Sequence, residues 1–225
     1  MHVRDMPDAT MWVEPFIEHQ GERRRFWLRR PRNVGERLLI AAKGTPIPAT
    51  SGDRIVILLD LRTAFGSGGH GTTEGCLAAL ERFVRAGDRV LDAGTGTGIL
   101  AIAAHRLGAA HVTAVDIDRR ACAETERNLA LNGIARGVVV AEGPVRSVPG
   151  RYDVVVANLR TPVLAGIVQD LSDRMLPGGI AILSGILERE LHPFLSRMER
   201  HGLEPLETRA CRGWMTLVSR ERPVT

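Results

Sequence analysis

A short apolar strand that leads directly into a glycine-rich loop most constrains the fold of this chain. Residues 90–92 (Val-Leu-Asp) are followed by Ala-Gly-Thr-Gly-Thr-Gly at 93–98, and an apolar helical pattern continues to residue 107. Glycine permits a tight turn and lets a ligand approach the backbone where a Cβ would clash. In a parallel α/β sheet such a loop lies at the carboxyl end of a strand, where ligands bind.

The sequence beyond residue 60 repeats this alternation of apolar strands and helical segments. The pattern is typical of a parallel sheet that helices cover on both faces. Strands are predicted at 89–92, 111–116, 138–141, 152–157 and 180–186, helices at 73–86, 98–107, 119–132, 161–175 and 191–201, and a closing hairpin at 203–211 and 214–220. The predicted fold is therefore α/β, with a doubly wound, mostly parallel sheet of seven strands that ends in an antiparallel hairpin.

The N-terminal part of the chain lacks this regular alternation. Short strands are predicted at 26–28, 37–41 and 54–59, with turn-rich sequence before the last of them. We therefore expect an N-terminal extension over residues 1–59 and a main domain over residues 60–225. The extension is expected to act as a lid, as a substrate-recognition segment, or as the arm of a homodimer.

The charge of the chain is a weak indication of its partners. Basic residues outnumber acidic ones by 30 to 26, but Lys43 is the only lysine. Nucleic-acid-binding proteins usually use both Lys and Arg for phosphate contacts, so a nucleic-acid partner is not expected. The one cluster, six arginines within residues 23–32, leaves an RNA partner open.

Cysteine spacing and apolar run lengths exclude several other classes of protein. Cys76, Cys122 and Cys211 are far apart and match neither a zinc motif nor a disulfide framework, so reduced thiols in a cytoplasmic protein and no metal site are expected. The longest apolar runs are far shorter than the ~20 residues that a membrane-spanning helix needs. We therefore expect no membrane partner.

Two carboxylates flank the glycine loop. Asp92 precedes it, where a carboxylate would repel a pyrophosphate but suits a cationic group such as an ammonium. Asp116 ends the next strand, where a carboxylate can accept hydrogen bonds from both hydroxyls of a ribose. The G-x-G-x-G spacing also differs from the G-x-G-x-x-G of dinucleotide-binding proteins, which disfavours an NAD-dependent dehydrogenase. Together these features predict a site for S-adenosylmethionine, the alternative being a tight turn between incidental acids.

Five segments extend this interpretation along the main domain. They are AFGSGGHGTT at 64–73, DAGTGTGILAIAA at 92–104, VDID at 115–118, VANL at 156–159 and SGIL at 184–187. In this order they resemble the class I methyltransferases of the PrmA family, which methylate a large-subunit ribosomal protein at amino groups. Trp214 also fits the pattern of that family, and the resemblance covers about residues 60–220.

The resemblance implies S-adenosylmethionine as cofactor and a set of residues that hold it. These cofactor-binding residues are Phe65, Gly66, Gly68, Thr73, Asp92, Gly94, Gly96, Asp116, Ile117 and Asn158. Residues 65–70 would form a glycine-rich lid, in which His70 either contacts the substrate or fixes the loop by a hydrogen bond. Many such enzymes place an Asp near the adenine after the third strand, where this chain has Glu142.

Asn158 is the expected catalytic residue, because methyl transfer from a sulfonium requires an aligned and unprotonated nucleophile. Its carbonyl oxygens could accept N–H groups of an amine and direct the lone pair of the nitrogen. The alternative role for Asn158 is to cap the helix predicted at 161–175. Arg160 stands where the family usually has an apolar or aromatic residue, and we expect it to bind a carboxylate or phosphate of the substrate.

These expectations combine into an S-adenosylmethionine-dependent N-methyltransferase. The 59 residues before Asp60 are fewer than the docking domain and linker of the family, which favours a small anionic or amino-acid-like amine as methyl acceptor. A protein acceptor, at a lysine or an N-terminal amine, is the alternative. An RNA methyltransferase and a non-catalytic nucleotide-binding protein are lesser alternatives.

Overall fold

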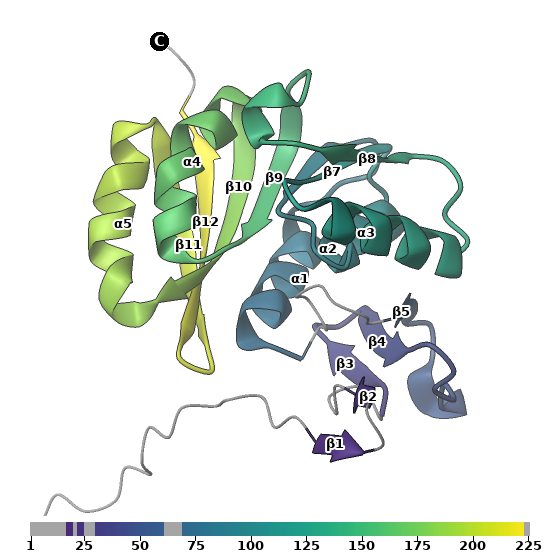
Figure 1. Ribbon diagram of the computed structural model, residues 1–225. Coiled ribbons are helices and arrows are strands. Elements are labelled where there is room, and N and C mark those ends of the chain that lie inside the picture. Colours follow the sequence, from purple (N-terminus) through teal and green to yellow (C-terminus); the bar gives the residue numbers. More distant parts are fainter. Residues whose placement is uncertain (1–16, 20–21, 25–29, 61–68, 223–225) are drawn as a thin grey trace, which may run out of the picture.

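The computed structural model of this chain describes residues 17–19, 22–24, 30–60 and 69–222 (Figure 1). The strand predicted at 26–28 and part of the arginine cluster at 23–32 lie outside these residues. Within them, no helix is long and apolar enough to span a membrane, and no cluster of His, Cys, Asp and Glu could hold a metal ion. Cys76, Cys122 and Cys211 carry free thiols.

The main domain is built on a seven-stranded sheet with the order β11-β12-β10-β9-β6-β7-β8. The strands from β10 through β9, β6 and β7 to β8 are parallel, whereas β12 is antiparallel to both β10 and β11. This confirms the predicted fold class. The strands are β6 (Arg89–Ala93), β7 (His111–Asp116), β8 (Val138–Glu142), β9 (Tyr152–Asn158), β10 (Met175–Leu187), β11 (Leu203–Cys211) and β12 (Trp214–Glu221).

Helices cover both faces of this sheet because its central strands are apolar on both sides. Val90 and Leu91 are neighbours in β6, are both fully buried, and belong to two different hydrophobic clusters. Side chains alternate between the two faces of a strand, so this pattern requires a core on each face. The helices are α1 (Gly71–Phe83), α2 (Ile99–Arg106), α3 (Arg119–Leu131), α4 (Thr161–Asp173) and α5 (Glu188–Arg200).

Three predicted boundaries were wrong near the β10 strand. Met175 was expected in the helix at 161–175, but that helix ends at Asp173 and Met175 pairs with Tyr152 of β9. The β10 strand therefore starts before its Pro-Gly-Gly sequence and accommodates it by a break in register between Met175 and Ile180. The next helix begins at Glu188, earlier than predicted, since Glu188 and Glu190 in its first turn are stabilised by the positive end of the helix dipole.

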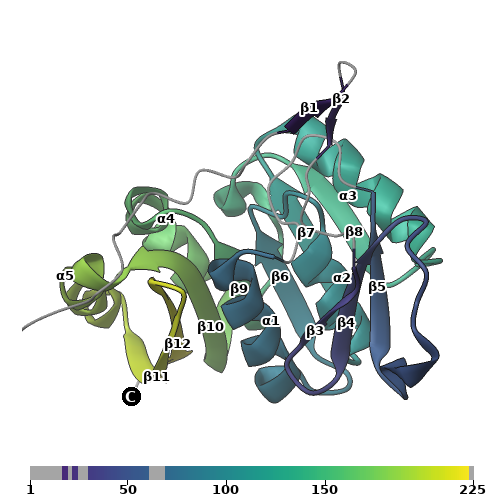
Figure 2. The same cartoon turned by 90° about the horizontal axis from the view of Figure 1, so that it is seen from below.

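A small sheet of order β3-β4-β5 precedes the main domain. It comprises β3 (Arg32–Val34), β4 (Leu38–Ala42) and β5 (Ile55–Leu59), with a 3₁₀ turn at Ala49–Ser51, and a separate hairpin pairs β1 (Ile17–His19) with β2 (Glu22–Arg24). Ile40, Ile57 and Leu59 are fully buried in the same cluster as residues of α1 and α2. Figure 2 shows the small sheet lying along these helices, so the described strands of the expected extension pack on the main domain.

Candidate active site

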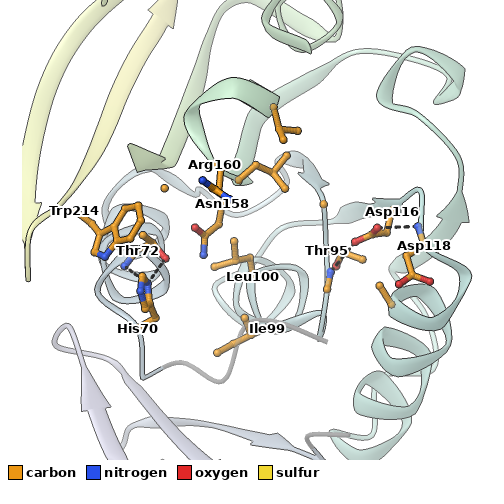
Figure 3. A pocket seen from close by; sticks show the side chains of 16 residues that line it. His70, Thr72, Thr95, Ile99, Leu100, Asp116, Asp118, Asn158, Arg160 and Trp214 are labelled. Carbon is orange, nitrogen blue, oxygen red and sulfur yellow. Dashed lines mark hydrogen bonds between the residues drawn. The ribbon is translucent and has the colours of Figure 1, made fainter. Parts of the chain in front are cut away.

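A cavity of about 600 Å³ lies at the carboxyl ends of the parallel strands. Figure 3 shows Thr95, Asp116 and Asp118 on one side of it and His70 and Trp214 on the other. Asn158, the last residue of β9, and Arg160, two residues further on, lie between these two groups. We call the first side the cofactor half and the remainder the acceptor half.

The glycine loop that follows β6 forms one wall of the cofactor half. Gly94, Gly96 and Gly98 all have positive φ, at 76°, 57° and 80°, a conformation that other residues rarely adopt. A Cβ on Gly94 would also lie 2.6 Å from Cδ2 of Leu159, and one on Gly98 would lie 2.8 Å from Cγ2 of Thr125. The loop therefore requires glycine both for its backbone conformation and for its close contacts.

Asp92 lies beneath this loop and is fully buried. Its Oδ2 accepts hydrogen bonds from Thr95 Oγ1 at 2.8 Å and from the Ala101 amide at 3.1 Å. Its Oδ1 has no hydrogen-bond partner among the described residues. Burial raises the pKa of Asp92 from 3.8 to about 7, although the hydrogen bonds from Thr95 and Ala101 oppose the shift. A buried carboxylate with an unused oxygen fits a cationic ligand group, such as the ammonium of S-adenosylmethionine.

Asp116 occupies the end of β7 and lines the cavity. Its Oδ2 accepts from the Gly96 amide at 3.1 Å and its Oδ1 from the Asp118 amide at 3.0 Å. Each carboxylate oxygen has a further lone pair for a hydroxyl group. The backbone thus orients a carboxylate that fits the two hydroxyls of a ribose.

Asn158 ends β9 and contacts the first turn of α1. Its Nδ2 donates a hydrogen bond to Thr73 Oγ1 at 3.2 Å, so Oδ1 is the side-chain atom that can accept from a ligand. The alternative that Asn158 caps the following helix is wrong, because the N-cap of α4 is Arg160. The side chain is instead held to a helix that lies 85 positions earlier in the sequence.

His70 is the N-cap of α1 and also lines the cavity. Its Nδ1 accepts from the Thr72 amide at 3.4 Å and lies 2.8 Å from Thr72 Oγ1. The imidazole ring is 5.2 Å from the ring of Trp214, centroid to centroid. His70 thus fixes the helix start, as one of its two expected roles requires, while its ring faces the acceptor half.

Arg160 is exposed at the edge of the acceptor half. The neighbouring Thr161 donates to Glu190 Oε2 at 2.6 Å. This hydrogen bond is the main cause that lowers the pKa of Glu190, and the charge of Arg160 contributes. The edge of the cavity therefore carries a guanidinium close to an ionised carboxylate.

The structure brings together most of the predicted site residues. His70, Gly94, Gly96, Asp116, Asn158 and Arg160 line the cavity, while Thr73 and Asp92 are fully buried. Ile117 does not belong to the described lining and is 78% exposed. Glu142 pairs with Asp116 in the sheet but is exposed and also outside that lining. Phe65, Gly66 and Gly68 lie outside the described residues.

Sequence reasoning assigned no site role to Trp214 or Asp118, although both line the cavity. Asp118 accepts from the Arg120 amide as the N-cap of α3, which an acidic residue directly before a helix indicates. Trp214 begins β12, and only the order of the sheet brings it beside His70. The role of Asp118 could have been found from local sequence, and that of Trp214 could not.

The fold is that of the class I S-adenosylmethionine-dependent methyltransferases, and the residues of the site fit that cofactor. The seven-stranded sheet ends in an antiparallel hairpin, and the glycine loop lies between a buried acid and an acid at the end of the next strand. Within this class, the chain belongs to the ribosomal protein L11 methyltransferase (PrmA) family, whose sequence profile matches residues 21–222.

Individual relatives agree with this assignment. A ribosomal protein L11 methyltransferase of Pelotomaculum thermopropionicum is 41% identical over 192 residues, which are 85% of this chain and 62% of that protein. One from Geobacter sulfurreducens is 44% identical over 84% of this chain and 58% of its own length. The chain thus spans about three fifths of these curated relatives.

Solved structures show the same fold. The ribosomal protein L11 methylase of Lactobacillus delbrueckii subsp. bulgaricus superposes with a TM-score of 0.80 at 30% identity, covering 85% of this chain and 98% of the other. A methyltransferase from Pyrococcus furiosus gives a TM-score of 0.61 at 19% identity, covering 73% and 88%. The second likeness concerns the fold alone.

Proposed function

We propose that this chain transfers a methyl group from S-adenosylmethionine to an amino nitrogen of ribosomal protein L11. The observation that carries the proposal is the placement of Asn158. Its amide group is held by Thr73, and it lines the acceptor half of the cavity. The choice of acceptor rests on the curated relatives, which are named for ribosomal protein L11.

In this proposal the cofactor half binds and orients S-adenosylmethionine, which supplies a methyl group on a positively charged sulfur. Asp116 would accept hydrogen bonds from the ribose hydroxyls, and Asp92 would stabilise the ammonium of the amino-acid end. The exposed Ile117 side chain is proposed to cover the adenine ring. Phe65, Gly66 and Gly68 are proposed as further contacts on the strength of their segment alone.

Asn158 is proposed to orient the acceptor. Its Oδ1 would accept an N–H of the neutral amine, which directs the nitrogen lone pair toward the methyl group. An amide does not take up a proton at neutral pH, so Asn158 aligns the amine rather than deprotonating it. Leu100 and Leu159, which also line the cavity, would exclude water from the reacting atoms. Alignment of this kind contributes up to ~7–11 kcal/mol to lowering a barrier.

A protein acceptor has better support than the small anionic amine that the sequence analysis favoured. The curated relatives over most of this chain are named for ribosomal protein L11. Arg160 at the cavity edge fits a carboxylate either on a protein segment or on a small molecule, and so does not favour the smaller acceptor. Nitrogen as the methylated atom, at a lysine or an N-terminal amine, is part of the proposal.

The test is incubation with S-adenosylmethionine labelled in its methyl group, in parallel with purified ribosomal protein L11 and with a set of small amino acids. We expect the label in the protein fraction, and mass spectrometry of its peptides should place the methyl groups on lysine or N-terminal nitrogens. Label found only on the small acceptors would overturn the proposed acceptor while retaining methyl transfer. Label in neither fraction, with no cofactor binding by calorimetry, would overturn the proposed activity.

A further inference from the structure

Three buried polar side chains lie along one edge of α3 and its C-cap, between the glycine loop and the small N-terminal sheet. Thr125, Asn128 and Asn132 follow one another at spacings of three and four residues, which places them on one helix face. The first two are fully buried and Asn132 is 8% exposed. Burying a polar group without a partner costs ~1–3 kcal/mol, so the partners of these groups show what the face does.

Two of these side chains bind carbonyl groups of the glycine loop. Thr125 Oγ1 donates to the carbonyl of Gly96 at 3.1 Å, and Asn128 Nδ2 donates to the carbonyl of Thr97 at 2.9 Å. Gly96 also donates its amide to Asp116, the carboxylate proposed to hold the ribose. The helix thus fixes the loop at the residues next to its ligand-binding groups.

Two of the side chains bind the β5 strand or the residue that follows it. Asn132 makes a pair of hydrogen bonds with Leu58, accepting from its amide at 2.9 Å and donating to its carbonyl at 2.7 Å. Asn128 Oδ1 accepts from the Asp60 amide at 2.8 Å. Asparagine side chains therefore occupy the edge of β5 that lies opposite β4, where a neighbouring strand would otherwise pair.

Of the three side chains, only Asn128 forms hydrogen bonds both with the glycine loop and with the end of the small sheet. Its carboxamide connects Asp60, at the end of β5, with Thr97 in the glycine loop, whereas Asn132 binds β5 and Thr125 binds the loop. An amide with its acceptor and its donor both engaged has one orientation, so a shift of either partner strains the other bond. None of the described residues of the small sheet lines the cavity.

We propose that Asn128 is a positioning residue for cofactor binding, through which the small N-terminal sheet holds the glycine loop in its binding conformation. The inference rests on the proposed use of S-adenosylmethionine. It assigns the residues of β5 a role in the affinity for cofactor, which they exert without contacting it. Asn132, one turn further along the helix, provides a control that fastens the same strand but leaves the loop untouched.

The experiment compares Asn128→Leu with Asn132→Leu, because leucine has nearly the volume of asparagine and no polar atoms. Asn128→Leu removes the side-chain acceptor of the Asp60 amide, and Asn132→Leu removes the two hydrogen bonds to Leu58, so both should lower the unfolding temperature. Only Asn128→Leu should raise the Kd for S-adenosylmethionine, by about tenfold for the lost hydrogen bond to the loop. The Kd of Asn132→Leu should stay within about twofold of that of the unchanged protein. The kcat at saturating cofactor should change little in either variant.

Hydrogen exchange provides a second measurement that needs no cofactor. Amides of residues 94–98 should exchange faster in Asn128→Leu than in Asn132→Leu, which a purely structural role of Asn128 would not produce. If Asn128→Leu does not fold, Asn128→Ser replaces it, since its shorter side chain cannot bridge the two partners.

Three outcomes would decide against the inference or against its basis. An unchanged Kd and unchanged loop exchange in Asn128→Leu would overturn the positioning role. An equal rise of Kd in Asn132→Leu would assign the effect to β5 as a whole and not to Asn128. Failure of the unchanged protein to bind S-adenosylmethionine would instead overturn the proposed function, and the exchange rates would still decide whether Asn128 orders the loop.

Discussion

The two halves of the cavity are built in different ways. The cofactor half comes from one continuous stretch, which runs from Asp92 in β6 through the glycine loop and α2 to the end of β7 and Asp118. The acceptor half combines His70, Asn158, Arg160 and Trp214, which come from the start of α1, the end of β9 and the start of β12. One half therefore depends on local sequence, and the other on the packing of distant elements.

The contacts that hold the acceptor half accordingly join residues that are far apart in the sequence. Arg212 in the β11–β12 turn donates to the carbonyl of Gly69 at 2.9 Å across 143 positions, and its guanidinium lies 3.3 Å from Glu74. Arg212 has a φ of 50°, the only positive value among the described residues other than glycine. The hairpin thus holds the start of α1, where His70 and Thr73 are. Substitutions in the acceptor half should affect turnover, and those in the cofactor half should affect cofactor affinity.

The largest effect is expected from Asn158→Ala. Loss of the group that aligns the amine should lower kcat by about 10²–10³-fold, the range found when one positioned hydrogen-bonding group is removed from an active site. The Kd for S-adenosylmethionine should change by less than about threefold. Single-turnover kinetics at saturating cofactor, combined with calorimetry, measure the two quantities separately.

Thr73→Val is the matched control for Asn158, because it keeps the side-chain volume and removes the oxygen that accepts from Asn158 Nδ2. It should lower kcat by about tenfold, since Asn158 remains but is less well oriented. Lost cofactor binding with unchanged turnover at saturation in Asn158→Ala would sink the assigned role and move Asn158 to the cofactor half.

The next largest effect is expected from Asp116→Ala, in the cofactor half. The loss of charge-assisted hydrogen bonds to the ribose should raise the Kd for S-adenosylmethionine by about 30-fold. Asp116→Asn keeps an oxygen that can accept from the Gly96 amide. Its Kd should therefore lie between those of the unchanged protein and Asp116→Ala. If kcat falls at saturating cofactor while Kd does not rise, the division into two halves is wrong.

The same difference decides how much of the site could be predicted from sequence. The glycine loop and its two acids are a local pattern, and in the structure Gly94 and Asp116 line the cavity while Asp92 is buried beneath the loop. Met175, which was predicted in a helix and lies in a strand, shows the limit of local patterns. It continues the helical periodicity of α4, but its partner Tyr152 lies across the sheet and draws it into β10. Tertiary pairing prevails over local preference there.

The acceptor half was predicted only where a motif named its residues. Trp214 illustrates why the rest was missed. A hairpin at this position was predicted, but the sequence does not reveal that β12 inserts between β11 and β10. That order pairs Trp214 with Leu187 and brings its ring to His70. The three asparagine and threonine side chains of α3 were missed for the same reason, as their partners are far away in the sequence.

A pH dependence should separate the halves further. The pKa of Asp92 is raised to about 7, so the carboxyl is neutral in more acidic solution and attracts a cationic group less. The Kd for S-adenosylmethionine should therefore rise by up to about fivefold as the pH falls from 7 to 6. Asp92→Asn should bind more weakly at pH 7.5 and lose this dependence, whereas Asn158→Ala should keep it.

The stability of the cofactor-free protein provides the complementary measurement. Between pH 3.8 and about 7 the folded protein holds a proton on Asp92 that the unfolded chain has released. Stability therefore falls as the pH rises through this window. Thermal unfolding of Asp92→Asn should show a smaller fall over the same range. Identical profiles for the two proteins would mean that burial of Asp92 does not have the energetic cost assigned to it.

The smallest effect is expected from Arg160→Ala, at the outer edge of the acceptor half. The guanidinium is exposed, so an ion pair with a carboxylate of the acceptor is weakened by water and by salt. The KM for the acceptor should rise by about threefold to fivefold at low ionic strength, with no change in the Kd for cofactor. Arg160→Lys should raise the KM less than Arg160→Ala does, because it keeps the charge but not the planar pair of donors. An unchanged KM at low salt would remove Arg160 from the acceptor half and leave recognition there to His70, Asn158 and Trp214, the residues that distant packing brings together.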